Sequence, residues 1–531
     1  MGRQSAGKAF MRGIARKWPH GSTLHGVGLR DADARKMIDQ LKGDGFVGRL
    51  TWSIPPNWSH ASQVGAIYYP CPLSKDIAHA RNSVNSAAFS LMGITHTLSE
   101  AGAMDDIAAL VLPPFKPWDA LICTSQAALG LVNGLQRDVR AWWSEHTGLK
   151  QFVDVALPVI PLGIDCPAFA PNAAERAIAR TNLEIGEQTT LFLSAGRLSI
   201  HAKANPAVLY QALEQIAQTK QVACIEAGIF ANEETRRYFH DARKALAPSV
   251  QFLWADGNDE IAFRQAWQGA DVFVSLSDNI QETFGLTPVE AMAAGLPVVV
   301  SDWNGYKDSV RHGVEGFRIP TVLPPPGTGE DIAFRYALGI DESEYDVYIG
   351  RISLATTVDQ HALASALFQL ASMPELRVNM GKAGIRRARQ VYDWPIILGR
   401  YVELAKELEK IRVAVPVRPS ETWPTRADPF LRFSHFSTHT LRGDWIVSAN
   451  PGADVRLQEL LGLRLANYAL DSTMFSAQEP VQLTTLLVNS GSQTVNNLLS
   501  AAGMATPQGI RALMWLWKFS IVGISPTPFF V

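Results

Sequence analysis

The chain has 531 residues, of which 47% are hydrophobic and 18% are charged, and its formal net charge is −2. This composition supports several packed cores and excludes a globally disordered chain. The charge argues against a protein that coats nucleic acid, because binding to the phosphate backbone needs an excess or a patch of Lys and Arg. Four scattered cysteines without a CxxC pair predict neither a metal site nor a disulfide framework, so we expect reduced thiols.

The sequence predicts a cytoplasmic protein. The first 18 residues lack the continuous apolar stretch of a signal peptide, and no run approaches the roughly 20 apolar residues that cross a bilayer. Residues 10–18 form a basic amphipathic segment. We expect an ordinary surface helix there, with peripheral contact at the inner face of a membrane as the alternative.

Short apolar runs alternate with amphipathic helical patterns through most of the chain. The runs occupy residues 49–54, 87–98, 121–125, 157–165, 190–198, 222–228, 249–255, 271–277 and 296–302. Buried strands separated by such helices predict parallel sheets with helices on both faces. The series is too long for one open sheet, and a proline-rich break lies at 158–171. We therefore predict an α/β protein with two doubly wound Rossmann-like domains.

The C-terminal part has a different pattern. Residues 413–429 are rich in proline and predict an extended linker. Residues 481–524 predict three short helices closed by an apolar strand, the pattern of a small winged-helix-like module. Its central stretch, QTVNNLLSAAG, has no Lys or Arg, so we expect packing or a protein partner there and not DNA binding. The predicted parts are an N-terminal domain (1–165), a second domain (166–393), a helix that returns to the first domain (394–412), a linker and accessory region (413–470), and the module (471–531).

The start of the chain is irregular for such a fold. Doubly wound domains open with a buried strand, whereas residues 2–7 have the pattern of a glycine-containing loop that leads into a helix. We expect that the first strand of the N-terminal domain is missing from this chain, with an irregular start of the domain as the alternative.

The segment from the strand at 271–277 to the next strand at 296–302 carries the strongest functional pattern. Thr287 is expected to be an N-cap, with Pro288 at the first helical position and Glu290 completing a capping box. This helix would begin at the carboxyl end of a parallel sheet. Free amide groups and the helix dipole there favour an anion, typically a phosphate.

A second pattern follows the strand TLFLSAG, where Arg197 and Lys203 come close together. Two cations beside a sheet edge suit a diphosphate, because Arg offers a fork of donors and Lys a compact charge. The alternatives are that both cations are solvated and that Glu290 is only a capping residue. Trp303 and Tyr306 either stack on a base or pack within their loop.

Together these segments resemble the retaining glycosyltransferases of family 4, which have the GT-B fold. The E-x7-E pattern appears as Glu282 and Glu290 in ETFGLTPVE, and the following run to HGVEGF is similar to the family along its length. The GR…K pattern appears as Arg197 and Lys203, and GITHTLS is similar to the family's histidine loop, with His96 at its centre. The resemblance covers about residues 1–410 and is strongest at 190–317.

The resemblance implies roles for the matching residues. Arg197 and Lys203 would neutralise a donor diphosphate, Glu290 would bind the ribose, Glu282 would face the transferred sugar, and His96 would reach it from the opposite domain. We expect Glu282, His96, Arg197 and Lys203 to act in catalysis. The backbone amides that would hold sugar and phosphate oxygens are those of Phe284, Gly285, Leu286 and Thr287. A glycine loop beginning at Gly2 would lie near the donor and acceptor.

The predicted activity is the transfer of a hexose from a UDP-, GDP- or ADP-type sugar to a glycan or lipid-linked acceptor, as in polysaccharide biosynthesis. The resemblance implies retention of configuration with no metal and no cofactor. A carboxylate pair that works as in glycosidases stays open as a rival mechanism. Other hypotheses are a non-catalytic scaffold and another GT-B enzyme, such as a sugar-nucleotide epimerase. His96 could also be a core histidine. For the acidic run 341–346 we expect solvated charges, with binding of an acceptor or partner as the alternative.

Overall fold

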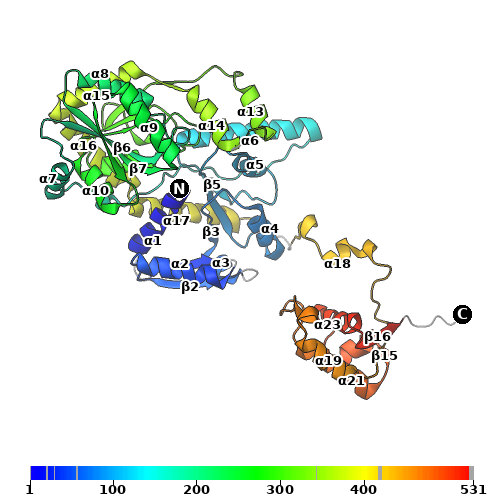
Figure 1. The fold of residues 1–531 in the computed structure, drawn as a ribbon. Helices are drawn as coiled ribbons and strands as arrows, with labels where there is room; N and C mark the ends of the chain where they lie inside the picture. Colours follow the sequence, from blue (N-terminus) through cyan, green and yellow to red (C-terminus); the bar gives the residue numbers. More distant parts are fainter. Residues whose placement is uncertain are drawn as a thin grey trace. The chain divides into compact units, whose positions relative to one another are not determined.

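The computed structural model describes residues 2–18, 22–28, 30–54, 58–341, 344–416 and 421–525. The chain divides into two compact units, residues 1–423 and residues 424–531. The first unit contains two α/β lobes (Figure 1), an N-terminal lobe coloured blue to cyan and a C-terminal lobe coloured mainly green to yellow.

The C-terminal lobe is built on a six-stranded parallel sheet with the order β11-β10-β9-β6-β7-β8. Its strands are β6 (Thr190–Leu198), β7 (Val222–Phe230), β8 (Gln251–Asp256), β9 (Val272–Ser275), β10 (Val298–Ser301) and β11 (Gly316–Ile319). The chain winds outward from β6 to β8 and then crosses to the other side of β6 at β9. Ligands of open α/β sheets bind at such a reversal, outside the carboxyl ends of the strands. The topology therefore places a binding edge after β6 and β9.

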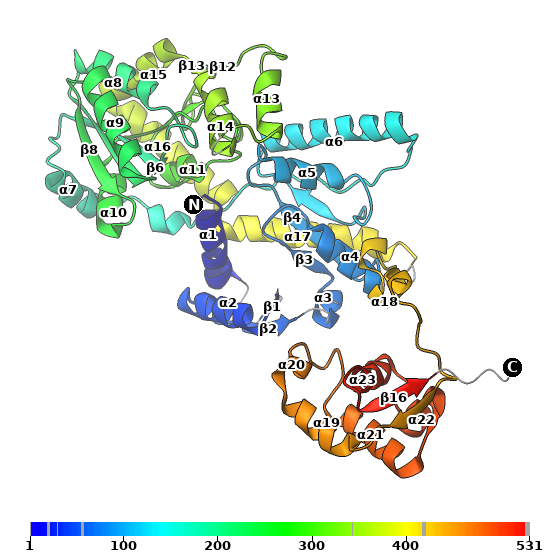
Figure 2. The same cartoon turned by 45° about the vertical axis from the view of Figure 1, so that its right-hand side comes forward.

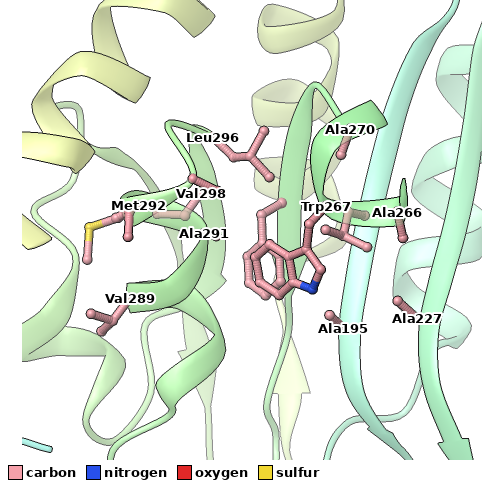
Figure 3. Packing of buried hydrophobic residues seen from close by; sticks show 14 of the residues in the cluster. Ala195, Ala227, Ala266, Trp267, Ala270, Val289, Ala291, Met292, Leu296 and Val298 are labelled. Atoms are coloured by element: carbon pink, nitrogen blue, oxygen red, sulfur yellow. The ribbon is translucent and has the colours of Figure 1, made fainter. Parts of the chain in front are cut away.

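Helices cover both faces of this sheet. They are α7 (Ala173–Asn182), α8 (Ala207–Ala217), α9 (Glu233–Leu246), α10 (Glu260–Gly269), α11 (Leu286–Ala293), α12 (Tyr306–Ser309), α15 (Gln360–Ser372) and α16 (Pro374–Arg387). Figure 3 shows the core on the face covered by α10 and α11. Trp267 of α10 stacks on Phe273 of β9 with ring centroids 5.7 Å apart, and Val289 and Met292 of α11 are fully buried. This packing sets where α11 begins relative to the sheet edge.

The N-terminal lobe contains two short parallel sheets. One pairs β1 (Thr23–Val27) with β2 (Arg49–Ser53), and the other has the order β3-β4-β5, with β3 (Ala66–Tyr68), β4 (Ser90–Ile94) and β5 (Ala120–Ile122). The helices of this lobe are α1 (Gly2–Lys17), α2 (Asp31–Gly43), α3 (Ser59–Val64), α4 (Lys75–Val84), α5 (Ala101–Ala109) and α6 (Gln126–Thr147).

Helix α17 (Trp394–Val413) leaves the C-terminal lobe and packs on the N-terminal lobe. Its apolar residues Trp394, Ile397 and Tyr401 share a buried core with Met92 and Ile94 of β4. A chain that forms two parallel α/β lobes and ends them with a helix returning to the first lobe has the GT-B arrangement.

The first residues of the chain form a helix, which corrects the glycine loop predicted from Gly2 to Gly7. Helix α1 begins at Gly2 because its apolar stripe finds a partner in α17: Ile14 is 5% exposed, and the Phe10 ring lies 5.7 Å from that of Trp394. The apolar side of residues 10–18 is thus packed against the chain itself. Among the described residues, no helix combines the length and apolar character needed to cross a bilayer.

A helical hairpin is inserted between two short antiparallel strands of the C-terminal lobe, β12 (Thr321–Val322) and β13 (Thr357–Val358). It consists of α13 (Glu330–Ala337) and α14 (Glu344–Leu354). Asp341 accepts hydrogen bonds from Arg335 and Arg351, which hold the pKa of its carboxyl well below the usual range. The run 341–346 is therefore not simply a set of solvated charges, since Asp341 joins the two helices.

The second unit has its own core of buried side chains between Trp445 and Ile524. Its helices are α18 (Pro429–Arg432), α19 (Ala453–Gly462), α20 (Arg464–Asn467), α21 (Gln478–Ser490), α22 (Val495–Ala501) and α23 (Pro507–Lys518). A three-stranded antiparallel sheet has the order β15-β14-β16, with β14 (Ile446–Ala449), β15 (Gln493–Thr494) and β16 (Val522–Ser525). The three helices and closing strand after residue 477 agree with the winged-helix-like pattern.

The core of the C-terminal module includes β14 and α19, which lie in the linker and accessory region (413–470) and not within 471–531. The reason is that β14 is the central strand: it pairs with both β15 and β16, so the module has no sheet without it. Arg511, one of two cations in residues 506–520, donates to the backbone oxygens of Thr473 and Met474. Its guanidinium is thus used inside the module.

Candidate functional site

Lys203 lies at the sheet reversal and pairs with the predicted carboxylate. Its Nζ donates to Glu282 Oε2 over 2.6 Å and to the Tyr306 hydroxyl over 3.3 Å. Burial opposes the charge of the ammonium group, but the attraction of Glu282 outweighs that cost and raises the pKa of Lys203. The side chain therefore stays protonated at neutral pH, as binding of an anion requires.

Arg197 is the second cation at this edge, near the end of β6. Its Nη2 donates to Gln281 Oε1 over 2.7 Å and to the Ala202 backbone oxygen over 3.2 Å. A cavity of about 40 Å³ is lined by both Arg197 and Lys203, together with the end of β6 and the start of the loop after β9. The structure thus brings the two predicted cations to one cavity.

Asn279 forms hydrogen bonds to both loops that carry the site, the loop of Lys203 and the loop of Glu282. The sequence patterns did not indicate this residue. Its side chain is fully buried and donates to the Lys203 backbone oxygen over 2.7 Å. Its Oδ1 accepts from the backbone amides of Gln281 and Glu282. A short polar residue just after a buried strand is the only signal that could have indicated this role. Because of Asn279, the loop of Glu282 keeps a defined position relative to the loop of Lys203.

Tyr306, for which the sequence left base stacking and loop packing open, is also part of the site. It is fully buried, and its hydroxyl lies 2.8 Å from Ser275 Oγ as well as beside Lys203. Trp303 is also used in packing, because its Nε1 donates to the Asn279 backbone oxygen over 2.8 Å. Both aromatic residues therefore support the loop, and the Tyr306 ring is too deeply buried to stack on a base.

Helix α11 begins two residues earlier than predicted, which corrects the assignment of Thr287 as its N-cap. The cap position is Gly285, at φ +80°, and no side chain caps the helix. Phe284, 2% exposed, anchors the chain in the core, so the glycine turns directly into the helix. Leu286 is the first helical residue.

The earlier start leaves the Thr287 hydroxyl in the first helical turn, where it is buried without a hydrogen-bond partner among the described residues. The first amides of the helix also have no side-chain cap. A buried polar group without a partner in a native fold calls for an explanation, and a bound anion at the helix start supplies one. The arrangement therefore fits phosphate or sugar oxygens at the backbone of 284–287.

Glu290 lies in the second turn of α11. Burial raises the pKa of its carboxyl to about 7, although the charge of Lys203 opposes that shift. The capping-box role predicted for Glu290 is absent, because the cap is a glycine without a side chain. The carboxyl group is thus not used as a helix cap, and it lies close enough to Lys203 to feel its charge.

This pKa predicts a pH dependence. The folded value of about 7 exceeds the ordinary value of 4.5, so the folded chain binds more protons and loses stability as pH rises between these values. If Glu290 binds sugar hydroxyls, its ionised form is the stronger acceptor, and donor affinity should rise about tenfold as pH passes through about 7. Calorimetric titration at several pH values tests this. Glu290→Gln should bind more weakly at every pH and show no such rise; an identical rise in that variant would contradict the assignment.

His96 lies in the loop that follows β4 in the opposite lobe. Its Nε2 is 2.8 Å from the Pro70 backbone oxygen, so the ring is oriented by a hydrogen bond. The same loop touches the C-terminal lobe, because Thr97 and Ser99 contact the Tyr345 hydroxyl at 2.9 and 2.8 Å. The Tyr345 hydroxyl also accepts from Gln281 Nε2 over 3.2 Å, so the histidine loop is joined through Tyr345 to the loop of Gln281.

The two lobes also touch at the start of α6. Ser125 Oγ donates to the Thr283 backbone oxygen over 2.8 Å, and the Gln126 amide donates to Asp308 over 2.5 Å. The loop that carries Glu282 is therefore contacted from the N-terminal lobe.

Among the described residues, no group of three or more His, Cys, Asp or Glu side chains is arranged to hold a metal ion.

A comparison with protein families matches this region. Residues 175–324 match the family model described as "Glycosyl transferases group 1". The matched segment contains Arg197, Lys203, Glu282 and Glu290, and it covers the sheet reversal and the start of α11. The family match is thus confined to the half of the first unit that carries the candidate site.

The chain spans only part of the length of the curated relatives that it matches. The chain is 31% identical to a D-inositol 3-phosphate glycosyltransferase of Geodermatophilus obscurus over 166 residues, 30% of this chain and 35% of that protein. It is 27% identical to a phosphatidyl-myo-inositol mannosyltransferase of Mycobacterium tuberculosis over 262 residues, 48% of this chain and 56% of that protein. Among solved structures, Anabaena Alr3699/HepE in complex with UDP is similar at a TM-score of 0.49 and 18% identity, covering 75% of this chain and 96% of that one.

Proposed function

We propose that this chain is a glycosyltransferase that moves a sugar from a nucleotide-diphosphate sugar to an acceptor hydroxyl. One observation carries the proposal: Arg197 and Lys203 share a cavity at the sheet reversal, within the segment that matches glycosyl transferases group 1. Two cations at the carboxyl edge of a Rossmann-like sheet suit a diphosphate. We propose family 4 as the subfamily, because the E-x7-E residues Glu282 and Glu290 lie in the same segment.

Each residue of the site has a proposed role toward the donor. Lys203 and Arg197 neutralise the diphosphate, and the uncapped amide groups at the start of α11 donate hydrogen bonds to its remaining oxygens. Glu282 leaves its ion pair with Lys203, in part or in full, to bind a hydroxyl of the sugar. Glu290 binds the ribose, and His96 approaches the sugar from the N-terminal lobe.

Charge stabilisation is the chemical task of these groups. As the sugar–phosphate bond breaks, the sugar gains oxocarbenium character and the nucleotide leaves with negative charge on its terminal phosphate. Preformed cations and amide groups at that position stabilise the charge without rearranging. We propose that the acceptor hydroxyl attacks from the face that the phosphate leaves, so configuration is retained, and that no metal ion takes part.

Calorimetry with UDP-, GDP- and ADP-hexoses tests donor binding first. We expect one base to bind, and EDTA to leave both binding and transfer unchanged. Analysis of the product by NMR should show the anomeric configuration of the donor. Binding without any turnover would instead support the scaffold hypothesis, and a changed sugar still attached to its nucleotide would support an epimerase.

The acceptor is proposed to be a glycan or a lipid-linked polyol. One relative is named for an inositol phosphate and the other for a phosphatidylinositol, which suggests a free and a lipid-borne hydroxyl as the two classes to compare. Transfer of labelled sugar to inositol phosphate in solution, and to vesicles that contain phosphatidylinositol, separates them. Peripheral membrane contact is proposed only for the second class, and a protein partner for the C-terminal module stays a separate proposal.

A further inference from the structure

The hydroxyl group of Tyr345 is a junction between the two lobes. Tyr345 is the second residue of α14 and lies in the acidic run 341–346. Its hydroxyl accepts from Gln281 Nε2 over 3.2 Å and also contacts Thr97 Oγ1 and Ser99 Oγ. A phenol has one proton to donate and two lone pairs, so these three contacts use its whole capacity.

Gln281 connects this junction to the donor site. Its Oε1 accepts from Arg197, while its Nε2 donates to Tyr345. The two contacts fix which way the amide points, since an amide turned over would set its NH₂ group against the guanidinium. A chain of hydrogen bonds therefore runs from the candidate diphosphate ligand Arg197 to the loop of His96.

The hairpin that presents Tyr345 is held firmly in the C-terminal lobe. Ser353 of α14 donates to Asp278 over 2.9 Å, and both side chains are buried. Burial raises the pKa of Asp278 to about 6, although the Ser353 and Asn205 hydrogen bonds oppose that rise. Ile349 is fully buried beneath the helix. Tyr345 thus projects from a fixed support.

The partner helix makes a second contact across the lobes. The Tyr336 hydroxyl accepts from the backbone amide of Ala101, at the start of α5, over 3.1 Å. Tyr336 also stacks on Tyr348 with centroids 4.4 Å apart. Figure 2 shows α13 and α14 beside α5 and the first part of α6, in agreement with Figure 1.

We infer that the hairpin α13–α14 is a latch between the lobes and that Tyr345 is a positioning residue of the donor site, acting through Gln281 on Arg197. The second half of this inference rests on the proposed function, whereas the latch itself does not. When the Tyr345 hydroxyl is bonded, the His96 loop is held to the loop of Gln281. When it is released, the His96 loop loses this contact with the C-terminal lobe, and Gln281 loses the partner that orients it toward Arg197.

The test replaces single hydroxyl groups. Tyr345→Phe keeps the ring and removes all three contacts, and Tyr348→Phe is the matched control on the same helix. In the ligand-free protein, hydrogen exchange of the amides in residues 93–101 should become faster in Tyr345→Phe than in wild type and in Tyr348→Phe. Ser99→Ala should produce part of this effect, and adding it to Tyr345→Phe should produce no more, because both remove the same contact.

Donor titration then tests the positioning role. Loss of these hydrogen bonds should raise the donor Kd of Tyr345→Phe by about threefold to tenfold, with a fall in kcat and an unchanged melting temperature. Unchanged hydrogen exchange in Tyr345→Phe overturns the latch, whatever the donor does. Faster exchange with a donor Kd equal to that of Tyr348→Phe overturns the positioning role. If the wild-type protein binds no sugar nucleotide, the proposed function is refuted. The latch still stands in that case if exchange is faster in Tyr345→Phe.

Discussion

Replacing Lys203 by methionine should lower kcat/KM for the sugar nucleotide by about 100- to 1,000-fold, the loss seen when one preformed donor to a developing charge is removed. Methionine keeps much of the length of the side chain but removes the ammonium group. The variant also leaves Glu282 without the cation that it contacts at 2.6 Å. Two negative groups, the carboxylate and the diphosphate, would then face each other without compensation.

Steady-state kinetics with the preferred donor measures this effect. Lys244→Met is the matched control, because Lys244 is an exposed residue of α9 away from the sheet reversal. The control should keep wild-type kinetics. If Lys203→Met also stayed within a few-fold of wild type, the cation would have no role at the leaving group, and its pairing with Glu282 would be only structural.

Replacing Gly285 by alanine should lower the free energy of unfolding by about 2–5 kcal/mol, combining the cost of a left-handed residue with that of overpacking. Gly285 has φ +80°, and an added Cβ would lie 2.1 Å from Cε1 of Tyr306. That ring cannot move freely, since it is fully buried and its hydroxyl is bonded to Ser275 and Lys203. We therefore expect donor affinity to fall together with stability.

Gly313→Ala separates the cost of left-handed backbone strain from the cost of overpacking. Gly313 has φ +77°, close to that of Gly285, but nothing lies within 4 Å of its Cβ position. The Gly313→Ala substitution should lower the free energy of unfolding by about 1–2 kcal/mol, the cost of left-handed strain alone, and leave donor binding unchanged. Chemical denaturation of both variants provides the comparison. Equal losses would show that the close approach to Tyr306 is relieved by local movement.

Sequence patterns predicted the parallel sheets because short buried runs and amphipathic helices are local features. The same reasoning placed Arg197 and Lys203 at one sheet edge, since both lie at the carboxyl end of the same buried strand, where ligands of open α/β sheets bind. This reasoning did not identify Asn279 and Tyr306 as site residues. Their importance comes from hydrogen bonds to Lys203 across 76 and 103 positions of chain, and no local pattern records a contact of that separation.

Two of the differences in secondary structure, the start of α11 and the helix at the start of the chain, have the same cause. Thr287 has the chemistry of an N-cap, but Phe284 is drawn into the core and Gly285 accepts a left-handed turn, so the helix starts before the threonine. The glycines near Gly2 suggested a loop, but the apolar stripe of α1 is covered by α17 from nearly 400 residues away. In both cases burial of apolar side chains outweighed local propensity.

The sequence by itself determined the alternation of strands and helices, the separate C-terminal module, and the residue types that suit a diphosphate. Those are properties of periodicity, composition and spacing along the chain. Only the tertiary structure decided where α11 begins, that β14 completes the module, and that Tyr345 joins Gln281 to the loop of His96. These features depend on which distant segments pack together. That packing follows from the free energy of burying whole surfaces, which local sequence patterns do not contain.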